Sequence, residues 1–462
     1  MAGMAAWWGL YTARRLHGAK ALLPVADGWR IYMQGVAQVP QVLLGALCAR
    51  AQTLHGVRLY HLHTEGPTPQ LDPSLRGRLR DISLFVGANV RDAVNRGDAD
   101  YLPVHLSEAE ALFRSGRIPL AGVLVQVSPP DAQGLVSLGL SVEAVRGAME
   151  AARYVVAQVN SLVPRTRGDA LLPVECFDAF VEADEPIFSI ERRHAASGII
   201  EALGRHVAAL VEDGSCLQLG IGAVPDAVAP QLRGRVGLGI HTEMFSDGLM
   251  ELMEAGAADG RAKSIDSGLA IASFVEGSRR LYAFVADNPA VVMRSLKYTN
   301  APRTIRRNRR VVAVNSALQV DLTGQVVAES LGPVQWSGVG GQVDFLRGAA
   351  LAPEGRAVVA LPSTARTASA TISRIVRQLN AGAVVTTTRA RADYVVTEHG
   401  IADLRGKTLA ERAAALIAVA HPAYRDALAE GRPAASLGDG EGGPNEVCRD
   451  VAVGEAEQGH RG

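Results

Sequence analysis

The amino-acid sequence predicts an α/β fold with largely parallel sheets, and two observations carry this prediction. Short apolar runs, rich in valine, isoleucine and leucine, alternate with longer segments of helical periodicity along most of the 462 residues. The runs are continuously apolar rather than alternating, which is typical of strands that are covered on both faces. The helical segments between them are therefore expected to be the crossover connections that cover the sheets.

The individual elements follow from the same pattern. The helical periodicity predicts helices over 41–52, 142–152 and 199–211. Six apolar runs are predicted as strands: 123–127, 154–157, 216–219, 311–314, 358–360 and 383–385.

The chain is long enough for two or three domains, at about 100–200 residues per domain. A boundary is expected at 183–196, where Ala183-Asp184-Glu185-Pro186 ends one α/β segment. This divides the chain into an N-terminal extension (1–24), an N-terminal domain (25–188) and a C-terminal domain (189–430). The last stretch, 431–462, is rich in glycine and lacks apolar periodicity, so it is predicted to be a disordered tail.

Charge and cysteine content exclude several classes of protein. The 47 basic and 47 acidic side chains cancel, so no general attraction to nucleic acid or to an anionic membrane is expected. No apolar run reaches the about 18 residues of a membrane helix. The four cysteines are far apart, without a metal-ligand spacing, which favours a reducing compartment and a cytoplasmic protein. The acid-free start, with Arg14 and Arg15, leaves a transit peptide open, but it lacks the secretory pattern.

The first candidate site is the segment Gly220-Ile221-Gly222-Ala223-Val224, which follows a predicted strand. Pro225 suits the first position of a helix there. Glycines let a ligand approach the backbone, and free amides at a helix start can hold an oxyanion or a phosphate. The alternative is a tight strand-to-helix turn without a ligand.

The second candidate is Glu243, in Ile240-His241-Thr242-Glu243-Met244-Phe245. It follows a short apolar strand, and ligands of open α/β sheets bind at that edge. A partly desolvated carboxylate is a better nucleophile than a hydrated one. A solvated loop carboxylate is the alternative. Ser246 or Asp247 is expected to cap the next helix.

These two segments together imitate a dinucleotide-binding fingerprint. Gly220 and Gly222 are followed by an acid 21 residues after Gly222, but Pro225 replaces the third glycine. A nicotinamide-dependent dehydrogenase therefore stays a distant alternative.

Further segments compete for the chemistry. The glycine-rich stretch 335–345, with Trp336 and Phe345 near its ends, is expected to form a backbone-lined wall for a ligand or a structural loop. Two more acids compete with Glu243: Glu65, which repeats the His-Thr-Glu triplet, and Glu398, in Thr397-Glu398-His399-Gly400. His61 and His63 could ligate a metal, but no further ligand stands at a supporting spacing, so they are interpreted as structural and no metal is predicted.

Taken in order, the motifs resemble the acetyl-CoA hydrolase/transferase family, close to its 4-hydroxybutyrate CoA-transferase branch, over about residues 25 to 430. The matching segments are Phe85–Arg91, Val127–Asp131, Pro164–Thr166, Gly220–Val224, Ile240–Met244, Asn315–Ala317, Val339–Phe345, Leu361–Ala365 and Thr397–Gly406.

The resemblance implies two similar open α/β domains with the active site between them, and a homodimer. It places the catalytic glutamate on Glu243, rather than on Glu65 or Glu398. It implies that coenzyme A (CoA) contacts Gly220 to Val224, Leu318, Ser337 and Gly341. Arg366 stands where the family has a lysine. The arginine keeps a positive charge for a phosphate but spreads it over the planar guanidinium group. Arg167 and Gln133 replace family histidines, which leaves the acid specificity open.

The implied activity is CoA transfer between an acyl-CoA and a small carboxylic acid, with no permanently bound cofactor. A carboxylate would attack the thioester, and a glutamyl-CoA thioester would follow in a ping-pong mechanism. Backbone amides around Gly222 and Gly341 are the predicted oxyanion donors. Acetate, propionate, butyrate, succinate and 4-hydroxybutyrate remain open as acids. Hydrolysis of acyl-CoA on the same scaffold is the closer alternative.

Overall fold

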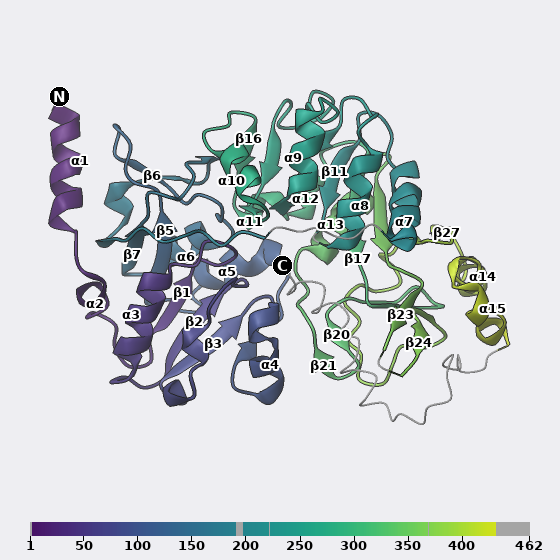
Figure 1. Cartoon of the computed structure of the whole chain (residues 1–462), viewed down its shortest axis with the longest axis horizontal. Coiled ribbons are helices and arrows are strands. Elements are labelled where there is room, and N and C mark those ends of the chain that lie inside the picture. Colours follow the sequence, from purple (N-terminus) through teal and green to yellow (C-terminus); the bar gives the residue numbers. More distant parts are fainter. Residues whose placement is uncertain (1, 191–196, 221, 368, 431–462) are drawn as a thin grey trace. The chain divides into compact units, whose positions relative to one another are not determined.

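The computed structural model (Figure 1) describes residues 2–190, 197–220, 222–367 and 369–430. The chain forms two compact units that do not follow a single cut in the sequence. Unit 1 comprises Met1–Glu191, His241–Asp247 and Leu269–Ala301, and unit 2 comprises Arg192–Ile240, Gly248–Gly268 and Pro302–Gly462. Two short segments from the second half of the chain, one of them carrying Glu243, therefore pack with the first half.

Unit 1 is built on a seven-stranded sheet of parallel neighbours in the order β10-β7-β5-β1-β2-β3-β4. Its strands are β1 (Arg30–Met33), β2 (Val57–His61), β3 (Leu79–Ser83), β4 (Asp100–Tyr101), β5 (Gly122–Val127), β7 (Val155–Val159) and β10 (Ala179–Glu182). Its helices are α1 (Ala2–Ala13), α2 (Gly18–Ala21), α3 (Gln41–Ala51), α4 (Ala88–Arg96), α5 (Ala109–Arg114), α6 (Val145–Ala151), α10 (Arg279–Val285) and α11 (Leu296–Thr299).

Smaller sheets complete unit 1. Their strands are β6 (Leu135–Ser137), β8 (Arg167–Gly168), β9 (Leu171–Pro173), β13 (Met244–Phe245), β14 (Ala270–Ala272), β15 (Phe274–Val275) and β16 (Val291–Met293). β5 and β7 are buried at every position, because neighbouring strands and helices cover both faces. An apolar cluster of α2, α3 and the sheet, which includes the fully buried Leu43, Leu47 and Leu59, forms the core here.

Unit 2 is built on a six-stranded sheet in the order β12-β11-β17-β22-β26-β27, in which only β26 and β27 are antiparallel neighbours. Its strands are β11 (Cys216–Leu219), β12 (Gly239–Ile240), β17 (Val311–Ser316), β22 (Arg356–Ala360), β26 (Tyr394–Thr397) and β27 (Gly400–Asp403). Its helices are α7 (Gly198–Ala209), α8 (Ala223–Gln231), α9 (Asp247–Glu254, whose first residue belongs to unit 1), α12 (Pro302–Ile305), α13 (Gln342–Leu351), α14 (Leu409–Val419) and α15 (Pro422–Ala429).

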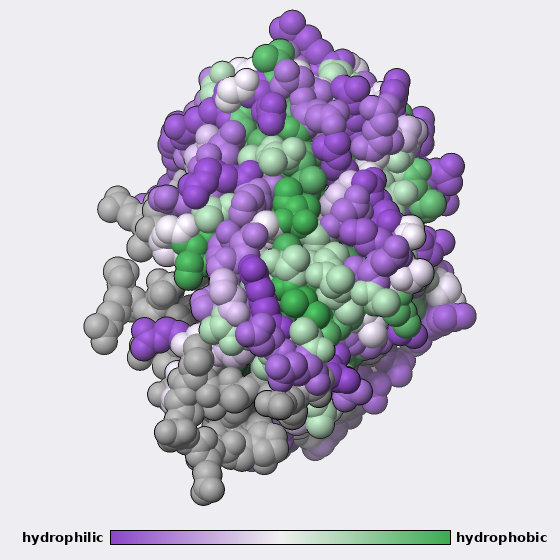
Figure 2. Space-filling view, turned by 90° about the vertical axis from the view of Figure 1, so that its right-hand side faces the viewer, coloured by the Kyte–Doolittle hydropathy of each residue, from purple (hydrophilic) through white to green (hydrophobic). Residues whose placement is uncertain are grey.

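Short strands extend unit 2 beside this sheet: β18 (Gln319–Asp321), β19 (Val326–Val327), β20 (Ser330–Leu331), β21 (Val334–Gln335), β23 (Thr364–Arg366), β24 (Thr371–Ser373) and β25 (Ile375–Val376). The core lies between the sheet and α13 to α15. Figure 2 looks from the side on which Figure 1 shows α14 and α15, and an apolar strip crosses this face between polar margins. No helix in the described ranges is long and apolar enough to cross a membrane.

The two largely parallel sheets with covering helices confirm the predicted fold class. Five of the six predicted strands form, as do the helices α3, α6 and α7 at the predicted places. The strand predicted at 383–385 is wrong: Val384 and Val385 are exposed in a loop after Gly382, which has a φ of 78°. The backbone amide of Val384 binds the Ser330 hydroxyl instead of a strand.

Two helix starts also differ from the predictions. α6 begins at Val145 rather than at 142, because Glu143 adopts a φ of 32°, outside the helical region. α8 begins at Ala223, so Pro225 is its third residue rather than its first. Proline is compatible with that position because amides in the first helical turn have no acceptor inside the helix. The predicted tail 431–462 lies outside the described residues.

Candidate active site

The backbone of Glu243 is held by a neighbouring segment of unit 1. His241 forms a parallel bridge with Ile271, and the Thr242 amide donates to the Ile271 carbonyl at 2.9 Å. The Glu243 carbonyl accepts from the amides of Ser273 at 2.8 Å and Phe274 at 3.1 Å. β13 then continues beside β15 as a parallel pair. Glu243 therefore stands on a loop whose main chain is fixed on both sides.

The Glu243 carboxylate is half-buried and is bound by Asn300. The Asn300 side-chain amide donates to Oε2 of Glu243. Asn300 is fully buried at the end of α11, and the Thr299 hydroxyl donates to its Oδ1 at 2.9 Å. Because an ionised carboxylate only accepts hydrogen bonds, the NH2 group of Asn300 is the end that faces Glu243.

The other members of the His-Thr-Glu triplet support this loop. His241 is 2% exposed, and its Nε2 lies 2.9 Å from the Thr299 carbonyl. Thr242 is buried and donates its hydroxyl to the Met244 carbonyl at 3.0 Å. Met244 and Phe245 are buried as well, which agrees with the predicted apolar surroundings. His241 and Asn300 thus connect the Glu243 loop to α11 at two points.

The competing acid Glu398 lies in unit 2 and is bound at both oxygens. Ser363 donates its amide to Oε2 at 2.8 Å and its hydroxyl to Oε1 at 2.6 Å. The Glu398 side chain is 8% exposed, and its Oε1 also lies 3.5 Å from His399 Nε2. Because Ser363 follows β22 and Glu398 follows β26, this carboxylate connects the ends of adjacent strands.

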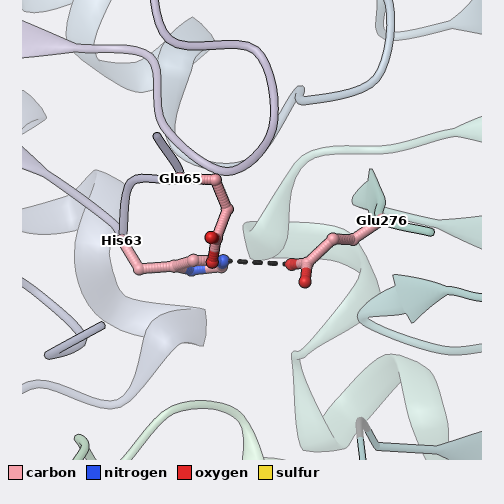
Figure 3. Close-up of side chains that lie close together, drawn as sticks. All are labelled: His63, Glu65 and Glu276. Carbon is pink, nitrogen blue, oxygen red and sulfur yellow. Dashed lines mark hydrogen bonds and ion pairs between the residues drawn. The ribbon is translucent and has the colours of Figure 1, made fainter. Parts of the chain in front are cut away.

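The third acid, Glu65, belongs to a cluster with His63 and Glu276, in which the ligand-type atoms all lie within 4.8 Å of one another (Figure 3). His63 Nε2 is 3.2 Å from Glu276 Oε2, and both side chains are buried. Burial alone lowers the pKa of His63, but the hydrogen bond and the charge of Glu276 raise it above its usual value. His61, in contrast, is fully buried against Asp81 at 2.8 Å, in a structural pair.

No further ligand stands at a supporting sequence spacing from the two histidines, but the fold brings Glu276 to His63, and the absence of a metal stays a prediction. Glu276 lies 213 residues away in the sequence, so no spacing rule could find it. Asn300 was also missed, because an asparagine after a short helical stretch has no distinguishing pattern. The buried contact of His61 with Asp81 agrees with the interpretation of His61 as a structural histidine.

In unit 2, the predicted glycine turn occupies the place where the order of the strands reverses. β11 is followed in sequence by β12 on one side, whereas β17 and the later strands lie on the other. Open α/β sheets bind ligands outside the carboxyl ends of the strands at such a point. Gly222 has a φ of 111° and precedes α8, and nothing lies within 4 Å of the position of an added Cβ. Ile221 lies outside the described residues.

The other residues for which CoA contacts are implied also belong to unit 2. Gly341 precedes α13, and the Ser337 hydroxyl donates to the Ala328 carbonyl at 3.1 Å. Leu318 and Ala365 line a small pocket. The next residue, Arg366, is exposed at the end of β23, and no hydrogen bond or ion pair engages its side chain within the described ranges.

The remaining candidates lie at the surface. Arg167 is exposed in β8, and Gln133 is exposed in the turn after Asp131. A basic stretch with five arginines between 303 and 310 is an alternative phosphate site in the sequence, but its Arg309 and Arg310 are bound to Glu354.

Comparison with known proteins connects these features to a family. Residues 11–191 match the acetyl-CoA hydrolase/transferase N-terminal domain, and residues 277–431 match the C-terminal domain of the same family. The chain belongs to the acetyl-CoA hydrolase/transferase family.

Similar proteins agree with this assignment over nearly the whole chain. The 4-hydroxybutyrate coenzyme A transferase of Clostridium kluyveri is 42% identical over 91% of this chain and 98% of its own. The succinyl-CoA:acetate/propanoyl-CoA:succinate CoA transferase of Fasciola hepatica is 42% identical over 87% of this chain and 84% of its own. The crystal structure of RipA from Yersinia pestis superposes with a TM-score of 0.86, at 31% identity, over 98% of this chain and 99% of RipA.

Proposed function

We propose that this family member is an acyl-CoA:carboxylate CoA-transferase whose nucleophile is Glu243. The observation that supports it is the placement of Glu243: its main chain is fixed by Ser273 and Phe274, and its half-buried carboxylate is oriented by Asn300. A nucleophile that is held in one orientation loses less entropy on reaching the transition state. The names of the two curated relatives, both CoA transferases, agree with this activity.

The proposed first half-reaction proceeds in two steps. A Glu243 oxygen attacks the thioester carbonyl, the carbon–sulfur bond breaks, and a mixed anhydride and the CoA thiolate form. The thiolate then attacks the Glu243 carbonyl of the anhydride, which releases the first acid as a carboxylate and leaves a glutamyl-CoA thioester. A second carboxylate reverses these steps and leaves as the new acyl-CoA.

Asn300 has a role in both states of Glu243. Its amide orients the free carboxylate, and it can donate to the Glu243 carbonyl oxygen while negative charge develops there. A neutral donor suits this task, because a cation would stabilise the free carboxylate more strongly and make it a poorer nucleophile.

Binding of CoA is proposed for unit 2, at Gly220 to Val224, Leu318, Ser337, Gly341 and Arg366. The glycine turn at the reversal of strand order and the amides that begin α8 support a site for a negatively charged group. Arg366 is exposed and available as a phosphate partner. No permanently bound cofactor or metal is required by this chemistry.

Mass spectrometry of trapped enzyme tests the proposal. Incubation with acyl-CoA without an acceptor acid should add the mass of CoA minus water to the peptide that contains Glu243. An adduct on Glu65 or Glu398 would overturn the assignment of the nucleophile. Free CoA that appears at the same rate with and without a carboxylic acid would identify a hydrolase instead. A homodimer, implied by the family resemblance, is tested by sedimentation of the same preparation.

A further inference from the structure

The fully buried Glu143 contacts two of the segments that hold Glu243. Its amide donates to the Ser273 carbonyl at 3.3 Å, and the Ser273 amide donates in turn to the Glu243 carbonyl at 2.8 Å. The Glu143 carbonyl accepts from the amide of Leu296, the first residue of α11, at 3.1 Å. The same helix ends next to Asn300, whose side chain binds the Glu243 carboxylate. One residue of unit 1 therefore connects the segment that fixes the Glu243 backbone with the helix that presents its donor.

The side chain of Glu143 is anchored to the end of β1. Its Oε1 accepts from the Gly35 amide at 2.6 Å, and its Oε2 accepts from the Tyr32 hydroxyl at 2.8 Å. The Ser141 hydroxyl adds a longer bond to Oε1, at 3.3 Å. Tyr32 and Glu143 are both fully buried, and hydrogen bonds in such a low-dielectric interior are stronger than in water. The carboxylate thus fixes residues 141–143 to the seven-stranded sheet.

The conformation and the burial of Glu143 both cost free energy. Its φ of 32° lies outside the regions that residues other than glycine favour. Burial raises the pKa of its carboxyl group, against the hydrogen bonds from Gly35 and Tyr32, which lower it. A position that only had to be filled could hold an apolar side chain without this desolvation. Strained residues cluster at active sites, where the surrounding structure fixes them, so the position indicates a role beyond packing.

We propose that Glu143 is a positioning residue, which fixes the Ser273 segment and α11 relative to each other and so keeps Asn300 aligned with the Glu243 carboxylate. This inference rests on the proposed function, because the alignment affects the reaction only if Glu243 is the nucleophile. Glu143 acts through the main-chain bonds of Ser273 and Leu296 and takes no part in the bond changes. A nucleophile displaced by about 1 Å can react on the order of a hundredfold more slowly, so a support at this distance has a measurable effect.

Single-turnover formation of the CoA adduct from acetyl-CoA, without an acceptor acid, tests the proposal. Glu143→Ala should lower this rate by about ten- to a hundredfold, because residues 141–143 lose their anchor on β1. The dissociation constant of free CoA should change by less than about threefold, because the lost interaction acts on the reacting groups and not on binding. Glu143→Gln keeps an oxygen for the Gly35 amide and should recover most of the rate.

A double-mutant cycle with Asn300→Ala separates positioning from general stability. If Glu143 acts through α11, Asn300→Ala should cost less than about threefold in the Glu143→Ala background, because the donor is already misaligned there. Asp81→Asn is the matched control: it removes a buried carboxylate from the same sheet, and Asn300→Ala should keep its full effect in that background. Tyr32→Phe, which removes one donor to Glu143 and keeps the ring, carries the cycle if Glu143→Ala does not fold. Additive effects in the cycle would overturn the proposal.

Failure of this inference is distinct from failure of the proposed function. A CoA adduct that forms on Glu243 at the native rate in folded Glu143→Ala or Tyr32→Phe would reject the positioning role and leave the transferase proposal intact. Absence of any CoA adduct on Glu243 in the native enzyme would reject both.

Discussion

Glu243 in unit 1 and Glu398 in unit 2 stand in similar sequence settings, each beside a histidine and a threonine after an apolar strand, yet the structure treats them differently. Glu398 accepts two hydrogen bonds from Ser363, one at each oxygen, and connects the ends of β22 and β26. Glu243 is oriented by the side-chain amide of Asn300, while its own main chain is fixed by β15 and its neighbours. The position of an acid at a strand end is therefore insufficient to identify a nucleophile.

The difference has a chemical consequence. A carboxylate with donors on both oxygens is stabilised in its charged form and is a weaker nucleophile. In Glu398 the donors serve the sheet, so the side chain contributes to structure. In Glu243 the main-chain bonds serve the fold, and the Asn300 amide binds Oε2 of the carboxylate that we propose as the nucleophile.

Replacing each acid by alanine is the largest test of this comparison. Glu243→Ala should lower kcat on the order of 10⁴-fold or more, because the covalent route is lost. Glu398→Ala should lower kcat by less than about tenfold but destabilise the protein by about 1–3 kcal/mol, because Ser363 loses its acceptor. Initial rates and chemical unfolding of both variants measure the two effects. A larger loss of kcat in Glu398→Ala than in Glu243→Ala would reverse the assignment.

Removing the donor of Glu243 should have the next largest effect. Asn300→Ala removes a hydrogen bond to a charged group, worth about 1.5–3 kcal/mol, so kcat should fall by about ten- to a hundredfold. Thr299→Val keeps the shape of the side chain but removes the hydroxyl that orients Asn300, and a smaller loss is expected. Single-turnover formation of the CoA adduct measures both. Unchanged adduct formation in Asn300→Ala would show that the amide has only a structural role.

Arg366 extends the comparison to substrate binding in unit 2. Arg366→Ala should raise KM for acyl-CoA by about ten- to a hundredfold, as expected for a charge-assisted phosphate contact. KM for the acid should stay unchanged, because the contact is with the nucleotide part of CoA. Arg303→Ala, from the exposed basic stretch, is the matched control and should change neither constant. Equal increases in both KM values would indicate a structural arginine.

Features that depend on neighbouring residues in the sequence were predictable, whereas features that depend on contacts between distant segments were not. The buried strands 216–219 and 311–314 were predictable because continuous apolar runs are local signals. The choice of Glu243 as the proposed nucleophile rests on the order of many motifs, since Glu65, Glu243 and Glu398 look alike locally. Asn300 and Glu276 could not be predicted, because their partners are distant in the sequence: Asn300 lies 57 residues from Glu243, and Glu276 lies 213 residues from His63.

The sequence also gave no indication that the Glu243 segment packs with the first half of the chain. Its segment and residues 269–301 join unit 1 through hydrogen bonds of main-chain groups, such as those between Val142 and Ser273 and between Val275 and Leu140. Main-chain bonds leave no trace in residue type, so no apolar period or charge pattern marks them.

The smallest expected effect concerns the pH dependence of stability at His63. Burial lowers the pKa of His63, but Glu276 outweighs burial, so the folded-state pKa lies above the usual value of 6.5. The folded protein then binds the proton more tightly than the unfolded chain does. This stabilisation is fully present below the unfolded pKa and is lost as pH rises through the folded pKa.

Comparison with His63→Gln, which carries no titrating ring, isolates this contribution. The free energy of unfolding of the native protein should fall relative to the variant as pH rises above 6.5, by at most about 1.4 kcal/mol per pH unit for one proton. Chemical unfolding at several pH values between about 6 and 9 measures the difference in unfolding free energy between the native protein and the variant. If the difference in unfolding free energy between native protein and variant instead increases with pH, His63 is neutral in the folded protein and forms no ion pair with Glu276. That outcome would also sharpen the contrast with Glu398, whose hydrogen bonds come from a serine that does not titrate in this range.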